Sequence, residues 1–176
     1  MKHRKLVVAA AALTIALLAT AGVVAAGSLK NYGTHLKGVN EVPARETNAQ
    51  GQAVFKLSSD GQSLDYKLIV ANIDNVVASH IHVGAGDGHG PVVAFLYGNA
   101  APGGGGIQGV IGEGTITAAN LVGPLAGQPL SALIAEINAG NTYVNVHTND
   151  GIAPTNTGAG DFASGEIRNQ IAPHGH

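Results

Sequence analysis

The sequence predicts an all-β fold: an antiparallel Greek-key sandwich or barrel of about eight strands with one or two short helices. Three observations predict it. Short runs in which apolar and polar residues alternate recur along the chain. Turn residues separate these runs, chiefly glycine, which occurs 26 times. A single segment, 130–140, carries apolar residues at helical spacing, so strands must supply nearly all of the regular structure.

The first strands are expected in the N-terminal part of the domain. A weak strand at 28–36 precedes the extended segment GVNEVPA. Residues 51–73 form the clearest hairpin, because apolar residues alternate with polar ones on both sides of the turn Asp60-Gly61. This hairpin contributes two strands.

Three more strands are expected at 76–84, 91–98 and 109–117. A glycine-rich turn joins the first two of them. The GGGG stretch before the third lacks the Lys-Ser/Thr of a phosphate-binding loop, so it is interpreted as a turn.

Helix 130–140 has Ser131 as the candidate N-cap and Gly140 at its C-terminal end. Strands at 142–148 and 162–172 complete the set. The residues expected in the core are Phe55, Leu57, Leu68, Ile81, Val92, Phe95, Val144, Val146 and Ile167.

The N-terminal residues 1–26 are interpreted as a signal peptide. Basic residues precede an apolar run, and Val24 and Ala26 stand before Gly27 as small residues stand before a cleavage site. We therefore expect cleavage after Ala26 and a secreted, periplasmic or cell-surface protein. The alternative is an uncleaved anchor, because the run is just long enough to span a bilayer.

The composition of the remaining chain limits its partners. Residues 27–171 are expected to form one β-domain and residues 172–176 a disordered tail. Three of the nine Lys and Arg residues lie within the first five positions, so six stand against eleven Asp and Glu afterwards. This balance excludes a nucleic-acid surface, and no segment after the signal peptide predicts a membrane span. Cysteine is absent, so the fold must be held by its core.

Histidines gather on two of the expected strands. Side chains alternate along a strand, so His80 and His82 face the same side and can bind one transition metal together. The same alternation places Tyr143, Asn145 and His147 on one face of 142–148. If the two strands pair, His147 completes a three-histidine site for copper or zinc, with copper preferred because its affinity for such ligands is normally higher.

The turn that follows the first two histidines holds His89 and Asp87. His89 is a candidate fourth ligand or a partner of a ligand. Metal binding needs neutral imidazoles, so we expect the metal affinity to fall below about pH 6.5. The alternative interpretation is that the histidines are hydrogen-bonded polar residues at the rim of the sandwich, with no metal.

Glu41, Glu166 and Arg168 are expected to form a structural ion pair. Glu166 and Arg168 share a strand face, and Glu41 lies in an extended segment from which it can reach the arginine. The planar guanidinium suits bidentate binding of a carboxylate. The alternative role for Arg168 is to guide an anion toward the metal. No Ser-His-Asp or Cys-His arrangement is present, so no catalytic residue is assigned.

Five segments together resemble the CHRD domain, which is named after chordin and occurs in secreted bacterial proteins. They are GVNEVPA, DGQSLDYKLIVANI, SHIHVGAGDGHGPVVAFLYG, GNTYVNVHTND and GEIRNQI. The resemblance covers roughly 30–171. Two features depart from it: the segment between VHT and GEIR is longer than usual, and Asn169 replaces a common glycine. The resemblance implies an extracellular module, which in chordin sequesters growth factors, and no settled role for bacterial members.

A fainter likeness is to copper–zinc superoxide dismutase, a Greek-key barrel. His80, His82, His147 and Arg168 match the order of three copper ligands and an anion-guiding arginine in that fold. The zinc-ligand loop and the disulfide of that enzyme are missing. The likeness therefore bears on the fold and on a metal, not on activity.

Three functional hypotheses follow. The first is a secreted, non-enzymatic extracellular binding module whose histidines hold copper or zinc, with an unidentified extracellular protein partner. The second is a metal-dependent redox enzyme resembling superoxide dismutase. The third is a metal-free cell-surface interaction domain.

Overall fold

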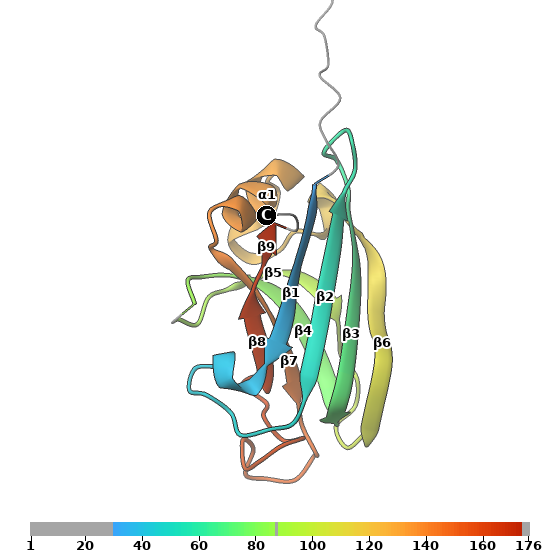
Figure 1. The fold of residues 1–176 in the computed structure, drawn as a ribbon, viewed down its shortest axis with the longest axis vertical. Coiled ribbons are helices and arrows are strands. Elements are labelled where there is room, and N and C mark those ends of the chain that lie inside the picture. Colours follow the sequence, from blue (N-terminus) through green and yellow to red (C-terminus); the bar gives the residue numbers. More distant parts are fainter. Residues whose placement is uncertain (1–29, 87, 174–176) are drawn as a thin grey trace, which may run out of the picture.

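Antiparallel strands supply most of the regular structure in the described residues, as predicted (Figure 1). The computed structural model describes residues 30–86 and 88–173. The strands are β1 Asn31–Lys37, β2 Gln50–Leu57, β3 Leu64–Asp74, β4 Val76–Val83, β5 Val92–Tyr97, β6 Gly106–Ile116, β7 Thr142–Thr148, β8 Ile167–Gln170 and β9 Ala172–Pro173. They form one sheet in the order β5-β4-β7-β8-β1-β2-β3-β6, and β9 pairs with β1.

The sheet curls until its two edges approach each other, which gives a nearly closed barrel. Tyr66 on β3 donates a hydrogen bond from its hydroxyl to the carbonyl of Leu96 on β5, at 2.9 Å. Gly112 on β6 lies against the same carbonyl, so closely that a Cβ atom there would come within 2.4 Å of it. The edge strands β5 and β6 therefore meet, although they are not paired as neighbours in the sheet.

One α-helix packs against an end of the barrel (Figure 1). Helix α1, Leu130–Asn138, buries Leu130, Leu133, Ile134 and Ile137. Pro129 occupies the N-cap position, so the predicted cap Ser131 lies inside the first turn instead. Among the residues that the structure describes, three short 3₁₀ helices complete the fold: η1 Gly38–Asn40, η2 Ala118–Asn120 and η3 Gly123–Leu125.

The interior of the barrel contains most of the residues that the alternation predicted. Phe55, Leu68, Ile81, Val144, Val146 and Ile167 are all buried. The prediction was wrong for Phe95, which is 55% exposed, while Leu57 and Val92 are only partly buried. The pairing of β4 with β5 is irregular at two places, and the consecutive residues Val93 and Ala94 are both buried. Strict alternation therefore fails on β5 and Phe95 faces outward.

The C-terminal end differs from the prediction of a disordered tail. Ala172 and Pro173 form β9 and lie opposite Gly33 and Tyr32 of β1, so these two residues are part of the sheet. Residues 174–176 and the predicted signal peptide lie outside the described residues. Within 30–86 and 88–173, no helix has the length and apolar character that crossing a membrane requires.

Candidate metal centre

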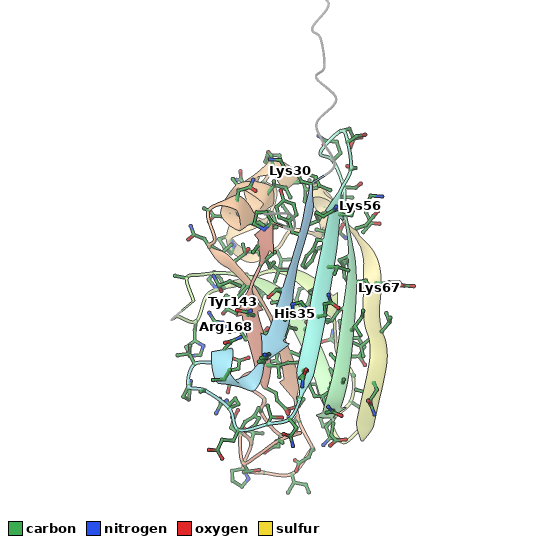
Figure 2. All side chains as sticks on the ribbon, viewed as in Figure 1. Lys30, His35, Lys56, Lys67, Tyr143 and Arg168 are labelled. Carbon is green, nitrogen blue, oxygen red and sulfur yellow. The ribbon has the colours of Figure 1, made fainter. Side chains whose placement is uncertain are left out.

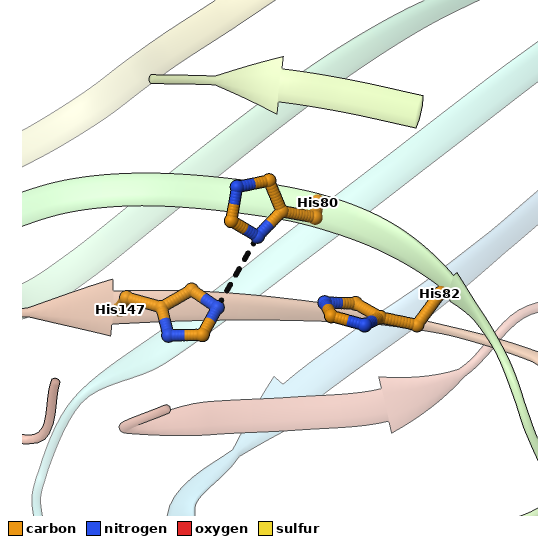
Figure 3. A group of neighbouring side chains, drawn as sticks. All are labelled: His80, His82 and His147. Carbon is orange, nitrogen blue, oxygen red and sulfur yellow. Dashed lines mark hydrogen bonds between the residues drawn. The ribbon is translucent and has the colours of Figure 1, made fainter. Parts of the chain in front are cut away.

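Three histidines from two neighbouring strands meet on one face of the sheet (Figure 3). In the β4–β7 pairing, His82 lies opposite Tyr143 and His80 lies opposite Asn145. His147 follows Asn145 by two residues on β7 and therefore lies on the same face. Directly opposed residues of an antiparallel pair share a face. The intervening residues belong to the core, so the histidines point away from the barrel interior. The ligand atoms that they offer lie within 4.8 Å of one another.

Two of the imidazoles already have a separation that suits one ion. Nδ1 of His80 lies 3.3 Å from Nε2 of His147, as the dashed line in Figure 3 marks. Nitrogen ligands at about 2.0–2.1 Å from a tetrahedral ion are about 3.4 Å apart. The His82 ring lies 5.5 Å from the His80 ring and 6.4 Å from the His147 ring, centre to centre.

Backbone carbonyls hold two of the three rings. Nδ1 of His82 lies 2.8 Å from the carbonyl oxygen of Gly90, and Nδ1 of His147 lies 3.0 Å from that of Ala163. A carbonyl oxygen only accepts, so both Nδ1 atoms carry the proton and the lone pair of each neutral ring is on Nε2. Metal-binding histidines characteristically donate from their remote nitrogen in this way, which fixes the tautomer and the ring orientation.

His82 lies between two acceptors. Gly90 faces its Nδ1, and the side-chain oxygen of Asn145 lies 3.0 Å from its Nε2. A neutral imidazole has one proton and can donate to only one of them. The Asn145 amide can turn and present its NH₂ group to a lone pair on Nε2, whereas the Gly90 carbonyl is fixed by the backbone. The backbone therefore decides the tautomer.

Burial keeps the three imidazoles neutral. Desolvation, followed by the neighbouring His147 and His82, lowers the pKa of His80 to about 4. Desolvation also lowers the pKa of His82 and of His147, although the hydrogen bonds to the Gly90 and Ala163 carbonyls act in the opposite direction. Neutral imidazoles are the form that binds a metal ion.

The rim of the cluster is apolar on one side. The exposed ring of Phe95 on β5 meets His80 edge to face, with centres 5.0 Å apart. His80 and His147 are partly buried, so the cluster remains within reach of solvent. His89, the predicted fourth ligand, is exposed in the turn after β4 and is not a member of the cluster.

Arg168 and Tyr143 lie next to each other (Figure 2), and the Tyr143 ring stacks on the His82 ring. The Arg168 guanidinium carbon is 3.5 Å from the centre of the Tyr143 ring. Its two terminal nitrogens donate to the carbonyls of Gly88 and Ala85 at 2.8 and 3.1 Å, and the residue is 2% exposed. Arg168 is therefore covered on all sides, and Tyr143 separates it from the histidines.

The prediction that Arg168 forms an ion pair with Glu41 and Glu166 was wrong. Among the described residues, an ion pair joins Lys67 and Glu113, whereas neither Glu41 nor Glu166 forms one with Arg168. Carbonyls of the turn after β4 occupy the guanidinium instead. β8 carries Arg168 beneath this turn, which charge complementarity in the sequence did not indicate.

Glu166 has a structural role in the loop between β7 and β8. Its carboxylate accepts hydrogen bonds from the hydroxyls of Thr47 and Thr148, both at 2.6 Å, and from the backbone N–H of Gly160 at 2.8 Å. It is 1% exposed. Three donors satisfy the buried charge, and they tie the loop to β7 and to the segment before β2.

Glu41 is buried with fewer partners. Its Oε1 atom finds no hydrogen-bond donor among the described residues and lies against Gly165, where a Cβ atom would come 2.5 Å from it. Burial raises the pKa of Glu41 to about 7, and the charges of Arg168 and then Arg45 limit the rise. Arg168 thus acts on Glu41 through its charge, without forming an ion pair.

Several residues of the centre had no signal in the sequence. The Gly90 and Ala163 groups that matter are backbone carbonyls, which every residue possesses. Asn145 and Tyr143 were placed on the correct face by alternation, but their contacts with His82 depend on the strand register. For Gly90, the sequence indicated only that a glycine follows His89 in the turn after β4.

The fold and the site define a β-barrel domain with a candidate three-histidine metal centre on its outer wall. The family model for the CHRD domain matches residues 32–171. The chain therefore belongs to the CHRD domain family, as its resemblance implied. A search of curated proteins finds no match.

Proposed function

We propose that this chain is a secreted, non-enzymatic extracellular binding module that holds copper or zinc at His80, His82 and His147. The observation that carries the proposal is the convergence of the three rings, whose ligand atoms lie within 4.8 Å of one another. His82 and His147 each place Nδ1 on a backbone carbonyl, and Nδ1 of His80 lies 3.3 Å from Nε2 of His147. Membership in the CHRD domain family supports the binding-module part.

The ligand atoms follow from the tautomers. His82 and His147 supply Nε2, and His80 supplies Nδ1 after its proton moves to the other ring nitrogen. Three imidazoles suit both Cu²⁺ and Zn²⁺, and the higher intrinsic affinity of copper makes it the preferred ion.

The position of Arg168 supports the non-enzymatic alternative over a redox enzyme that resembles superoxide dismutase. An anion-guiding arginine needs free N–H groups beside the ion. Here the guanidinium is buried behind Tyr143 and its terminal nitrogens are bound to Gly88 and Ala85.

The metal proposal is tested by titrating Cu²⁺ and Zn²⁺ into untagged protein that ends at Pro173. This form lacks His174 and His176, which can collect copper on their own. We expect one ion per chain, and we expect His80→Ala/His82→Ala to abolish binding. The matched control is His35→Ala/His89→Ala, which removes two exposed imidazoles outside the cluster and should leave binding unchanged. Binding that survives the first double change, or is lost with the second, would overturn the proposed site.

Secretion has its own test. The motivation is the pattern of basic residues, apolar run and small residues that ends at Ala26. The intact mass of protein recovered from outside the cytoplasm should correspond to a chain that begins at Gly27. A mass that includes residues 1–26 would contradict cleavage.

A further inference from the structure

We infer that Arg168 and Tyr143 are positioning residues for His82: they hold the turn after β4 so that the Gly90 carbonyl selects the metal-binding tautomer of the ring. This inference deepens the proposed function and rests on it for the metal, but its structural part stands on contacts in the metal-free protein. It also gives Arg168 a role that is neither an ion pair nor an anion guide.

The first step is the stack of three side chains. The His82 and Tyr143 rings are parallel within 4°, with centres 4.7 Å apart. The Arg168 guanidinium lies 3.5 Å from the Tyr143 ring centre. β4 and β8 flank β7 on opposite sides, so His82 and Arg168 approach the tyrosine from opposite directions. Tyr143 is thereby held between an imidazole and a cation, which fixes its ring plane.

The second step is that Gly90 binds both stacked rings through its backbone N–H and its backbone carbonyl. The N–H of Gly90 donates to the Tyr143 hydroxyl at 3.0 Å, and its carbonyl accepts from Nδ1 of His82 at 2.8 Å. Both stacked rings therefore bind the same residue. A Cβ atom at Gly90 would come 1.7 Å from the Val83 carbonyl oxygen, so only glycine fits where this carbonyl is needed.

The third step is the attachment of the turn to β8. Arg168 donates to two carbonyls of the turn, those of Ala85 and Gly88. Gln170 adds a third bond, from its side-chain nitrogen to the Gly84 carbonyl at 3.2 Å. A guanidinium presents its N–H groups as a rigid fork and spans two acceptors at once, which the single ammonium of lysine does not reproduce.

These steps decide which nitrogen of His82 is free. The ring has two acceptors, and a turn that moves away leaves the Asn145 oxygen as the better one. The proton then moves to Nε2, the atom that the proposed metal requires. Arg168 and Tyr143 therefore act on the metal through the tautomer of His82, without touching the ion.

The test begins with metal-free protein and uses ¹⁵N NMR of the histidine rings, which reports the tautomer of each imidazole. In the unchanged protein we expect His82 to carry its proton on Nδ1. Arg168→Lys keeps the charge and loses the fork, and Tyr143→Phe keeps the stack and loses the hydroxyl. Each change should give His82 a mixture of tautomers and lower Zn²⁺ affinity about 10–100-fold.

The controls separate this role from general damage. The His147 ring is bound to Ala163, in a different loop, and its tautomer should stay unchanged in both variants. Arg45→Lys, the same replacement in the other arginine–aromatic pair, should leave His82 unchanged. If Arg168→Lys fails to fold, Tyr143→Phe still tests whether the turn after β4 determines the tautomer of His82.

Two results would overturn the inference. One is an unchanged Nδ1–H tautomer and unchanged Zn²⁺ affinity in both variants, even with reduced thermal stability, which would make Arg168 and Tyr143 purely structural. The other is an equal change at His82 and His147. If the unchanged protein binds no Zn²⁺ or Cu²⁺ but its tautomers shift as expected, the proposed metal function fails while the positioning of His82 holds.

Discussion

Two arginine–aromatic pairs flank the histidine cluster, and each stands beside a loop whose carbonyl holds one ring. Arg168 lies 3.5 Å from the centre of Tyr143 and is almost fully buried. Arg45 lies 4.7 Å from the centre of Phe162 and is partly exposed. The first pair supports the turn that binds His82, and the second supports the loop that binds His147.

The two loops differ in how many supports they have. The turn 84–90 depends on Arg168 and Gln170 from β8 and on the stacked rings. The loop 149–165 has the Glu166 carboxylate inside it, and Thr148 and Phe162 exchange further hydrogen bonds at its base. Arg45 adds bonds to Ser164 and Gly165 at the surface. An arginine therefore matters most where a loop has few other buried partners.

The largest effect is expected from the central support of the β7–β8 loop. Glu166→Gln replaces an acceptor of three hydrogen bonds with a group that presents an NH₂ to buried donors. Each unsatisfied buried group costs about 1–3 kcal/mol, so the free energy of unfolding should fall by about 4 kcal/mol. Urea unfolding measures it. Glu113→Gln, at the exposed ion pair with Lys67, is the control and should change stability by less than about 1 kcal/mol; equal losses would refute the comparison.

The next effect is the pH dependence of stability that Glu41 contributes. Its pKa in the folded protein is raised to about 7, so the folded state binds this proton more tightly than the unfolded state. The contribution is fully present below the ordinary glutamate pKa of about 4.3 and is lost as the pH rises through about 7, up to about 3 kcal/mol. Unfolding between pH 4.5 and 7.5 should show this decline, and Glu41→Gln should remove it. A decline that persists in the variant would assign it to another group.

The two arginines can be compared directly by removing each charge. Arg168→Met leaves the Ala85 and Gly88 carbonyls without donors and should cost about 2 kcal/mol. Arg45→Met, at a partly exposed site, should cost less than about 1 kcal/mol. Hydrogen exchange shows where the structure is destabilised: amides of the turn after β4 should lose protection in Arg168→Met and not in Arg45→Met. Similar costs in both variants would show that burial does not separate the two pairs.

The smallest effect is expected for metal affinity as the pH falls. Imidazoles with an ordinary pKa near 6.5 lose metal below that value, as the sequence alone predicts. The pKa of His80 is about 4, and those of His82 and His147 are also lowered. Affinity for Zn²⁺ should therefore fall less between pH 7 and 5.5 than it would at imidazoles with an ordinary pKa. A loss as large as that of imidazoles with an ordinary pKa would show that burial does not lower the pKa values of these rings.

The sequence predicted those features that depend on local alternation. A period of two placed His80, His82 and His147 on outward faces, and the register of β4 with β7 then joined them. Phe95 was misplaced because the irregular pairing of β4 with β5 interrupts that period. Such a shift depends on how two distant strands fit together, which no single strand reveals.

Features that depend on the backbone of another segment could not be predicted. Arg168 was expected to seek a carboxylate, since opposite charges are visible in a sequence, but it binds the carbonyls of Ala85 and Gly88. The carbonyls that hold His82 and His147 have no residue signature either. The candidate ligands were therefore predictable, while the groups that orient them required the three-dimensional structure.

The strands that bear the histidines divide their two sides between separate tasks. Ile81, Val144 and Val146 stabilise the barrel from within, and the imidazoles stand between them along the chain but on the opposite side of the wall. A replacement of one imidazole by another kind of ligand thus leaves the packed interior intact. The inner positions of these strands thus determine folding, and the outer positions determine which ligand the barrel wall can bind.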